Sequence, residues 1–128
     1  MTTALLLIAH GSRNQEANAD LHHVVEEMRR RGPYAIVEPA FLELASPTIE
    51  EAGRRCVDLG AQRVLMIPYF LSAGVHVRED LHAHRGQLQG RFRGVEFILG
   101  EPLGVHPLLI DMVAQRALEA EQTSEPPG

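Results

Sequence analysis

Short runs of apolar residues alternate along this chain with segments in which apolar residues recur every three or four positions. The first run covers residues 4–9, and the segment that follows, residues 15–31, carries Leu21, Val25 and Met28 at helical spacing. Continuous apolar runs predict strands buried on both faces, whereas the helical spacing predicts amphipathic helices. Four such units can be counted, so the sequence predicts an α/β fold: a three-layer α/β/α single lobe with a four-stranded, mainly parallel sheet.

Proline and capping residues place the later boundaries. Pro39 interrupts the second strand, at about residues 35–42, and predicts an edge position or a bulge because proline cannot donate to a ladder. Ser46 is the expected N-cap of the second helix, with Pro47 in its first position. The third strand, residues 63–70, is expected to be the most buried. The remaining expected elements are a loop at 72–76, a helix at about 78–88, a strand at 95–99 and a last helix with Leu109, Val113 and Leu118 on one side.

The length of 128 residues fits one domain, which we place at residues 1–121. The polar stretch 122–128 is expected to be a disordered tail. A lobe of this size has a core of its own but cannot surround a large ligand, so a large ligand would require an oligomer.

Charge and cysteine content exclude several classes of function. The net charge is −5 and all 12 cationic residues are arginine, so the sequence predicts no nucleic-acid surface, no Schiff-base lysine and no phosphate-loop lysine. Cys56 is the only cysteine, which rules out an intrachain disulfide and a cysteine-based zinc motif and favours the reducing cytoplasm. The opening apolar run is short and turns polar at His10, so we expect neither a signal peptide nor a membrane span.

Three potential metal ligands, His10, Glu43 and His76, stand just past the first three predicted strands. The carboxyl ends of parallel strands converge on one crevice, so these residues can share a site. Two imidazoles and a carboxylate suit a divalent transition metal. Simpler interpretations remain open: His10 could only close its turn through a hydrogen bond, His76 could face water at a helix start, and Glu43 could be a solvated residue at a strand end.

Polar residues beside the two histidines are candidates for holding an anionic ligand. Arg13 and Arg78 flank His10 and His76, and a planar, permanently charged guanidinium group suits ligand carboxylates. Ser12, in the same turn as His10, is assigned to substrate binding with them. An ordinary surface role is equally compatible with each arginine.

The other histidines have weaker patterns. Those in predicted helices are one or two positions apart and so do not share a helix face: His22, His23, His82 and His84. The first two are expected at the surface, and the last two could at most form a peripheral metal-handling patch with His76. His106 is expected to cap the last helix.

Three motifs occur in a recognisable order: Leu6-Leu7-Ile8-Ala9-His10-Gly11-Ser12-Arg13, then Phe41-Leu42-Glu43-Leu44 with Ser46-Pro47, then Ile67-Pro68-Tyr69-Phe70-Leu71 with Gly74-Val75-His76 and Arg78-Glu79-Asp80. Together they resemble the class II chelatases, and within them the short-form sirohydrochlorin cobaltochelatase and ferrochelatase group. The resemblance covers about residues 4–107. The run His82-Ala83-His84 departs from the proline-containing sequence expected after the last motif.

The resemblance implies a chelatase-like, flavodoxin-like lobe that inserts a divalent metal ion into sirohydrochlorin. The metal would be Co²⁺ or Fe²⁺, and in some relatives Ni²⁺, on the way to cobalamin, sirohaem or the nickel tetrapyrrole. His10 and His76 would bind the metal and act in catalysis, with Glu43 as the accompanying acid. No redox cofactor or nucleotide would be needed, and two copies would form a homodimer around the macrocycle.

Two other classes of function are compatible with the same residues. A metal carrier would use the same ligands and the extra histidines, and would bind metal tightly without accelerating insertion. A non-catalytic tetrapyrrole-binding or structural module would use the strand-end residues for loop geometry alone. The ligand set suits Co²⁺, Fe²⁺ and Ni²⁺ alike, so the sequence does not name the metal.

Overall fold

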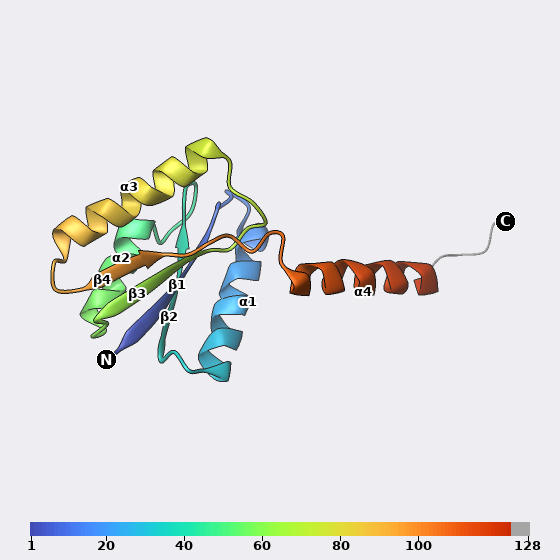
Figure 1. Ribbon diagram of the computed structural model, residues 1–128, viewed down its shortest axis with the longest axis horizontal. Helices are drawn as coiled ribbons and strands as arrows, with labels where there is room; N and C mark the ends of the chain where they lie inside the picture. Colours follow the sequence, from blue (N-terminus) through green and yellow to red (C-terminus); the bar gives the residue numbers. More distant parts are fainter. Residues whose placement is uncertain (124–128) are drawn as a thin grey trace.

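A computed structural model describes residues 1–123, in which strands and helices alternate along the chain (Figure 1). The elements are β1 (Thr3–Ala9), α1 (Gln15–Arg31), β2 (Ile36–Phe41), α2 (Ile49–Asp58), β3 (Arg63–Pro68), α3 (Val75–Arg91), β4 (Glu96–Leu99) and α4 (Pro107–Thr123). The strands pair in parallel in the order β2-β1-β3-β4. The predicted four-stranded parallel sheet is confirmed, and β2, which contains Pro39, lies at an edge as expected.

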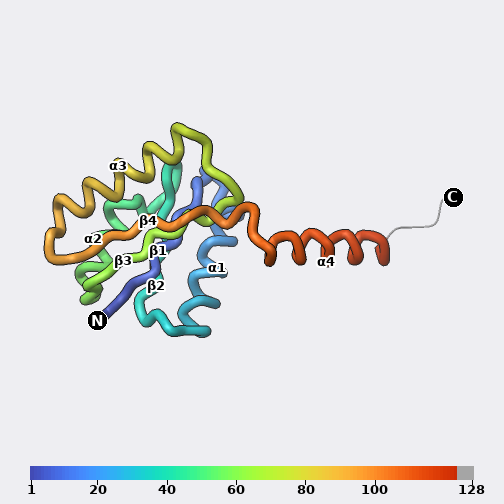
Figure 2. The backbone as a smooth tube through the Cα atoms, in the orientation of Figure 1, coloured from blue at the N-terminus to red at the C-terminus, as the bar shows by residue number. Residues whose placement is uncertain are grey.

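Helices on both faces of the sheet make the three layers (Figures 1 and 2). On one face, α1 packs Leu21 and Val25 against Leu5 and Leu7 of β1. On the other face, α2 and α3 pack against a cluster that contains Leu6, Ile8, Val64, Met66 and Phe97. Because β1 is covered on both faces, its sequence is a continuous apolar run and not an alternating one.

The burial of β3 differs from the prediction that this strand is the most buried. Val64, Met66 and Pro68 are buried, whereas Arg63, Leu65 and Ile67 are only half-buried, and β1 and β2 are more completely covered. The cause is that α1 lies over β1 and β2, so no helix in residues 1–123 covers the same face of β3.

The last helix, α4, extends away from the domain and has no buried residue (Figures 1 and 2). It continues to Thr123, so residues 122 and 123 are helical and not part of a disordered tail as predicted. The preceding run, residues 117–122, consists only of good helix formers (Ala, Leu, Glu and Gln), which explains the extension. The rest of the predicted tail, residues 124–128, lies outside the described residues. In residues 1–123, no helix is both long and apolar enough to cross a membrane.

The second helix begins two residues later than predicted, because Thr48 and not Ser46 is its N-cap. The Thr48 hydroxyl accepts a hydrogen bond from the Glu51 amide at 3.2 Å, and the Glu51 carboxylate accepts one from the Thr48 amide at 3.0 Å. The Pro47 carbonyl is bound instead to the amide of Phe41, at 2.9 Å, which ties this segment to the end of β2. The reciprocal pair around Thr48 is a capping box.

The third helix begins at Val75, three residues earlier than predicted, so His76 lies in its first turn and not in a loop. Gly74 is the N-cap, and its carbonyl accepts a hydrogen bond from the Arg78 amide at 3.0 Å. A glycine cap has no side chain to bind the helix amides, so the sequence offers a weaker boundary signal here than a polar residue would.

Thr48→Ala is expected to lower the free energy of unfolding by about 1 kcal/mol, because it removes the hydroxyl that accepts the Glu51 amide hydrogen bond. Ser46→Ala is the matched control and should change this free energy little. Urea unfolding followed by circular dichroism measures both, and equal losses in the two variants would contradict the assigned cap.

The other half of the same capping box depends on pH. Hydrogen bonds from the backbone and then the side chain of Thr48 lower the pKa of Glu51 below its ordinary value of 4.5. The ionised carboxylate therefore contributes stability above pH 4.5, and this contribution is lost as the pH falls through the lowered pKa. In the same unfolding experiment, the difference between the native chain and Glu51→Ala should shrink in acid.

Candidate functional site

The carboxyl ends of β1, β2 and β3 meet at one edge of the sheet, and the three predicted ligand residues follow these ends. His10 comes directly after β1, Glu43 lies two residues after β2, and His76 lies in the first turn of α3 after β3. All three residues are exposed. The edge therefore presents two imidazoles and a carboxylate to the solvent.

The loops that carry His10 and Glu43 are joined by direct backbone contact. The Glu43 amide donates to the His10 carbonyl at 3.0 Å, and the Leu42 amide donates to the Ala9 carbonyl at 2.9 Å. Gly11 has a φ of 94°, and a Cβ atom at this position would overlap the Glu43 carbonyl oxygen. A glycine is needed here for both reasons. The close approach makes the two loops one structural unit.

The ring of His10 stacks on Phe70, which connects it to the loop that follows β3. The ring centroids are 4.4 Å apart and the planes differ by 28°. The neighbouring Tyr69 amide donates to the Ile8 carbonyl at 2.6 Å, so the backbone of this loop is also attached to β1. The stack limits the orientations open to the imidazole. Nothing in the sequence marks Phe70 as the partner of His10.

Ser12 and Arg13 lie in the turn between β1 and α1, which a buried asparagine holds in place. The Asn18 side chain accepts a hydrogen bond from the Ser12 amide at 2.9 Å and donates one to the Ser12 carbonyl at 2.8 Å. The Ser12 hydroxyl accepts from the Asn14 amide at 3.0 Å, and Arg13 is exposed. Sequence reasoning missed Asn18, whose only signal is a polar residue on the helix face that also carries Leu21.

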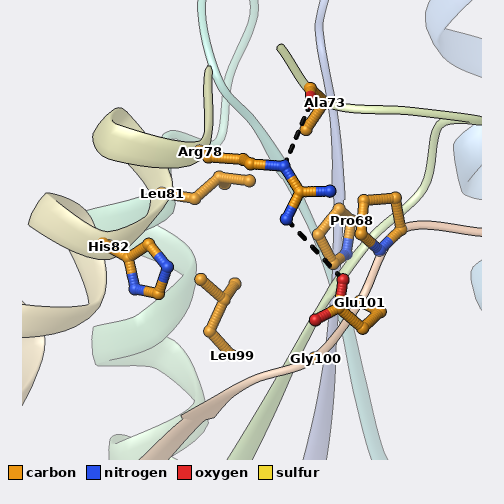
Figure 3. Close-up of a pocket in the computed structure, with 9 residues that line it drawn as sticks. Pro68, Ala73, Arg78, Leu81, His82, Leu99, Gly100 and Glu101 are labelled. Carbon is orange, nitrogen blue, oxygen red and sulfur yellow. Dashed lines mark hydrogen bonds and ion pairs between the residues drawn. The ribbon is translucent and has the colours of Figure 1, made fainter. Parts of the chain in front are cut away.

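Arg78 is held between the loop after β3 and the end of β4. Its Nε donates to the Ala73 carbonyl at 3.1 Å, and its Nη1 lies 3.8 Å from the Glu101 carboxylate. Figure 3 shows the guanidinium group pointing toward Glu101 across a small pocket that His82 and Leu99 also line. The ion pair with Glu101 joins the start of α3 to the segment after β4, two parts of the chain that the sequence did not connect.

The remaining histidines take other roles. His84 Nδ1 lies 2.8 Å from the Glu50 carboxylate and links α3 to α2. His106 Nδ1 accepts a hydrogen bond from the Leu108 amide at 3.1 Å and so caps α4, as predicted. Within the described part of the chain, no three His, Cys, Asp or Glu side chains form a group that could hold a metal ion. Residues 1–123 of one chain therefore contain neither the peripheral histidine patch nor a preassembled three-ligand site.

A hollow of about 290 Å³ lies beside His10, with Asn18, Phe41 and Tyr69 in its lining. Pockets that enclose drug-sized ligands measure about 300–1,000 Å³, so this hollow can hold part of a large ligand but cannot enclose it. Cys56 plays no part in the site: burial, and after it the charge of Glu38, raises the pKa of its thiol to about 12. A thiol of this kind stays neutral and is a poor ligand.

The fold and the edge define an α/β domain whose candidate ligand site lies at the carboxyl ends of its strands. The CbiX family model matches residues 4–120, and the chain belongs to the CbiX family.

Similar proteins share both sequence and fold with this chain. It is 38% identical over 112 residues to the chloroplastic sirohydrochlorin ferrochelatase of Arabidopsis thaliana, covering 88% of the chain and 50% of that protein. It is 32% identical over 123 residues to the sirohydrochlorin cobaltochelatase of Sulfolobus acidocaldarius, covering 94% of the chain and 96% of that protein. The solved structure of the sirohydrochlorin chelatase SirB from Bacillus subtilis subspecies spizizenii in complex with cobalt matches 93% of the chain and 51% of SirB, with a TM-score of 0.86 and 27% identity. The chain spans about half the length of the plant relative and of SirB, and nearly all of the archaeal relative.

Gly11→Ala is expected to destabilise the protein by more than about 1 kcal/mol, because alanine is strained at positive φ and its Cβ would push the two loops apart. The amide of Glu43 should also exchange its hydrogen faster. Gly86→Ala is the matched control: its Cβ would meet no atom within 4 Å, so it should be neutral or stabilising. If both variants have the same exchange rate at the Glu43 amide and the same free energy of unfolding, the backbone contact does not stabilise the protein.

Phe70→Leu is expected to move the ring-proton NMR signals of His10 downfield, because it removes the stacked ring while keeping an apolar side chain of similar size. The His10 signals are assigned by their loss in His10→Ala. Phe92→Leu, which alters a ring that contacts Phe97 instead, should leave them in place. Unshifted His10 signals in Phe70→Leu would rule out the stack in solution.

Proposed function

We propose that this chain inserts a divalent metal ion, Co²⁺ or Fe²⁺, into sirohydrochlorin, and so acts as a sirohydrochlorin metal chelatase in cobalamin or sirohaem biosynthesis. Membership of the CbiX family supports the reaction, together with the names of the relatives. The observation that carries the proposal is the linked edge: His10 is bonded through its backbone to the Glu43 loop and stacked on the loop that leads to His76.

In this proposal, His10 and His76 present the ion to one side of the macrocycle. Two pyrrole N–H protons must leave while the ion sheds its water and its protein ligands. A neutral imidazole can hold a transition metal and can also accept a proton near pH 7. Glu43, on the loop joined to that of His10, binds the ion or takes a released proton.

The metal must be held weakly enough to be released into the macrocycle. Affinity rises from Fe²⁺ through Co²⁺ and Ni²⁺ to Cu²⁺, so a complete ligand cage would retain the later ions. The open arrangement of the edge supports transient binding, because residues 1–123 contain no group of three potential ligands close enough to hold an ion. Ni²⁺ is compatible with the same ligands.

Substrate binding is assigned to Ser12, Arg13 and Arg78, whose donors suit the carboxylates of the macrocycle. The contact between Arg78 and Glu101 is loose, at 3.8 Å, so a substrate carboxylate can compete for the guanidinium group. The hollow beside His10 covers only part of a tetrapyrrole, which supports a homodimer with the substrate between two lobes. The single, buried thiol of Cys56 is compatible with a reducing, cytoplasmic setting.

The native protein should accelerate the absorption change of sirohydrochlorin under anaerobic conditions with at least one of Co²⁺, Fe²⁺ and Ni²⁺. His10→Ala and His76→Ala should each lower the rate by about 10²-fold or more, since each loses both a ligand and a proton acceptor. Glu43→Gln should lower the rate less. His23→Ala, which alters an exposed histidine on α1, is the matched control and should keep the native rate.

Each other outcome points to a different class of function. If the native protein does not exceed the uncatalysed rate with any metal, the chelatase proposal fails. Tight, stoichiometric metal binding without acceleration would then favour a metal carrier. Macrocycle binding that survives the loss of both histidines would favour a non-catalytic module.

A further inference from the structure

One buried residue of α1 is polar although it occupies the position of a core residue. Asn18, Leu21 and Val25 are the buried residues of this helix and recur at helical spacing. The two apolar residues pack in the cluster that contains β1, and Asn18 is only 6% exposed. A buried amide destabilises a fold unless its polar groups are hydrogen-bonded. The partners of Asn18, and not the packing of the core, therefore explain why this residue is an asparagine.

Both polar groups of Asn18 bind the backbone of one residue in the turn after β1. Its Oδ1 accepts from the Ser12 amide at 2.9 Å, and its Nδ2 donates to the Ser12 carbonyl at 2.8 Å. These two bonds hold the peptide groups on either side of Ser12. The other end of the turn is bonded through the His10 carbonyl to the Glu43 amide. Asn18 therefore holds the end of the turn that faces α1.

The turn held by Asn18 carries donors that lie beside His10. The Ser12 hydroxyl accepts from the Asn14 amide at 3.0 Å, which leaves its single hydrogen to donate to a ligand. Arg13, the next residue, is exposed. Asn18, Ser12 and His10 all line the hollow of about 290 Å³. A displacement of the turn would thus move the donors and change the hollow at the same time.

We propose that Asn18 is a positioning residue for the binding of the macrocycle. It does not bind the ligand itself but holds Ser12 and Arg13 where their donors meet ligand carboxylates. The inference rests on the proposed function for the identity of the ligand. A carboxamide suits this role because it accepts and donates at once and carries no charge.

Asn18→Asp tests the role with a side chain of the same size. An ionised carboxylate only accepts, so at neutral pH it leaves the Ser12 carbonyl unbound and places a buried charge beside it. The turn should move, and the dissociation constant of sirohydrochlorin should rise by about 10-fold, the effect of losing one hydrogen bond to a charged group.

The same variant should recover in acid. A protonated carboxyl group accepts through one oxygen and donates through the other, as the carboxamide does. Burial and the facing Ser12 carbonyl disfavour the charged form and raise the pKa of a carboxyl group at this position. The dissociation constant of Asn18→Asp should therefore return toward the native value as the pH falls through this pKa.

Asn14→Asp is the matched control, because it adds the same charge to the same turn. The Asn14 Oδ1 only accepts, from the Glu16 amide at 2.9 Å, and a carboxylate can do the same. This variant should therefore keep the native dissociation constant at every pH. Its ratio to Asn18→Asp at each pH removes the contribution of groups that are the same in both variants. The titratable and charged residues in and beside the hollow are His10, Arg13, Asp20 and Tyr69.

Two measurements without metal decide the proposal. The absorption change of sirohydrochlorin on binding gives the dissociation constant, and the NMR signals of the Ser12 and Arg13 amides report the position of the turn. Both should change in Asn18→Asp at neutral pH and return in acid, while circular dichroism verifies that the variants are folded.

Four results would overturn the role of Asn18. They are native binding by Asn18→Asp at neutral pH, amide signals that do not shift, a loss that acid does not reverse, and an equal loss in Asn14→Asp. A native chain that does not bind the macrocycle would overturn both this role and the proposed function. A native chain that binds the macrocycle but inserts no metal would refute the reaction alone, and the expected changes in binding would still support Asn18.

Discussion

The parallel pairing of β1 with β2 on one side and β3 on the other is the interaction on which the candidate site depends. Ile8, near the end of β1, is aligned with Ala40 of β2 and Pro68 of β3. The hydrogen bonding continues past the strands, from Leu42 and Tyr69 back to the end of β1. The position along the strands at which each loop begins is therefore fixed by the register of the sheet. Because these strands are buried and paired on both sides, side chains that are far apart in sequence reach the same edge.

The parts of the fold that depend on local chemistry could be predicted from the sequence. The bounds of α1 follow from its apolar spacing and from the glycine at its end. The start of α2 was predicted wrongly, because Ser46 and Thr48 are both good capping residues and the choice between them depends on the contact between Pro47 and β2. The half-burial of β3 could not be predicted, since it depends on α1 lying over β1 and β2 and not over the same face of β3.

The candidate site, like the fold, has a part that could be predicted from the sequence and a part that could not. The order of strands and ligands along the chain was enough to place His10, Glu43 and His76 at one edge, because every parallel strand ends there. The contacts that orient the side chains join loops from different units, as Phe70 does to His10. No pattern within one segment carries this information, and only the folded arrangement shows which side chains meet.

The contact of Gly11 with the Glu43 carbonyl has a consequence for how this site can change in evolution or by design. A loop normally tolerates insertions because its backbone faces water, but here two backbones touch, and an added residue would separate the histidine from the acid. Replacing a ligand side chain leaves that contact in place. The site is therefore free to vary in chemistry through its side chains, while the lengths of the two loops that carry them are fixed.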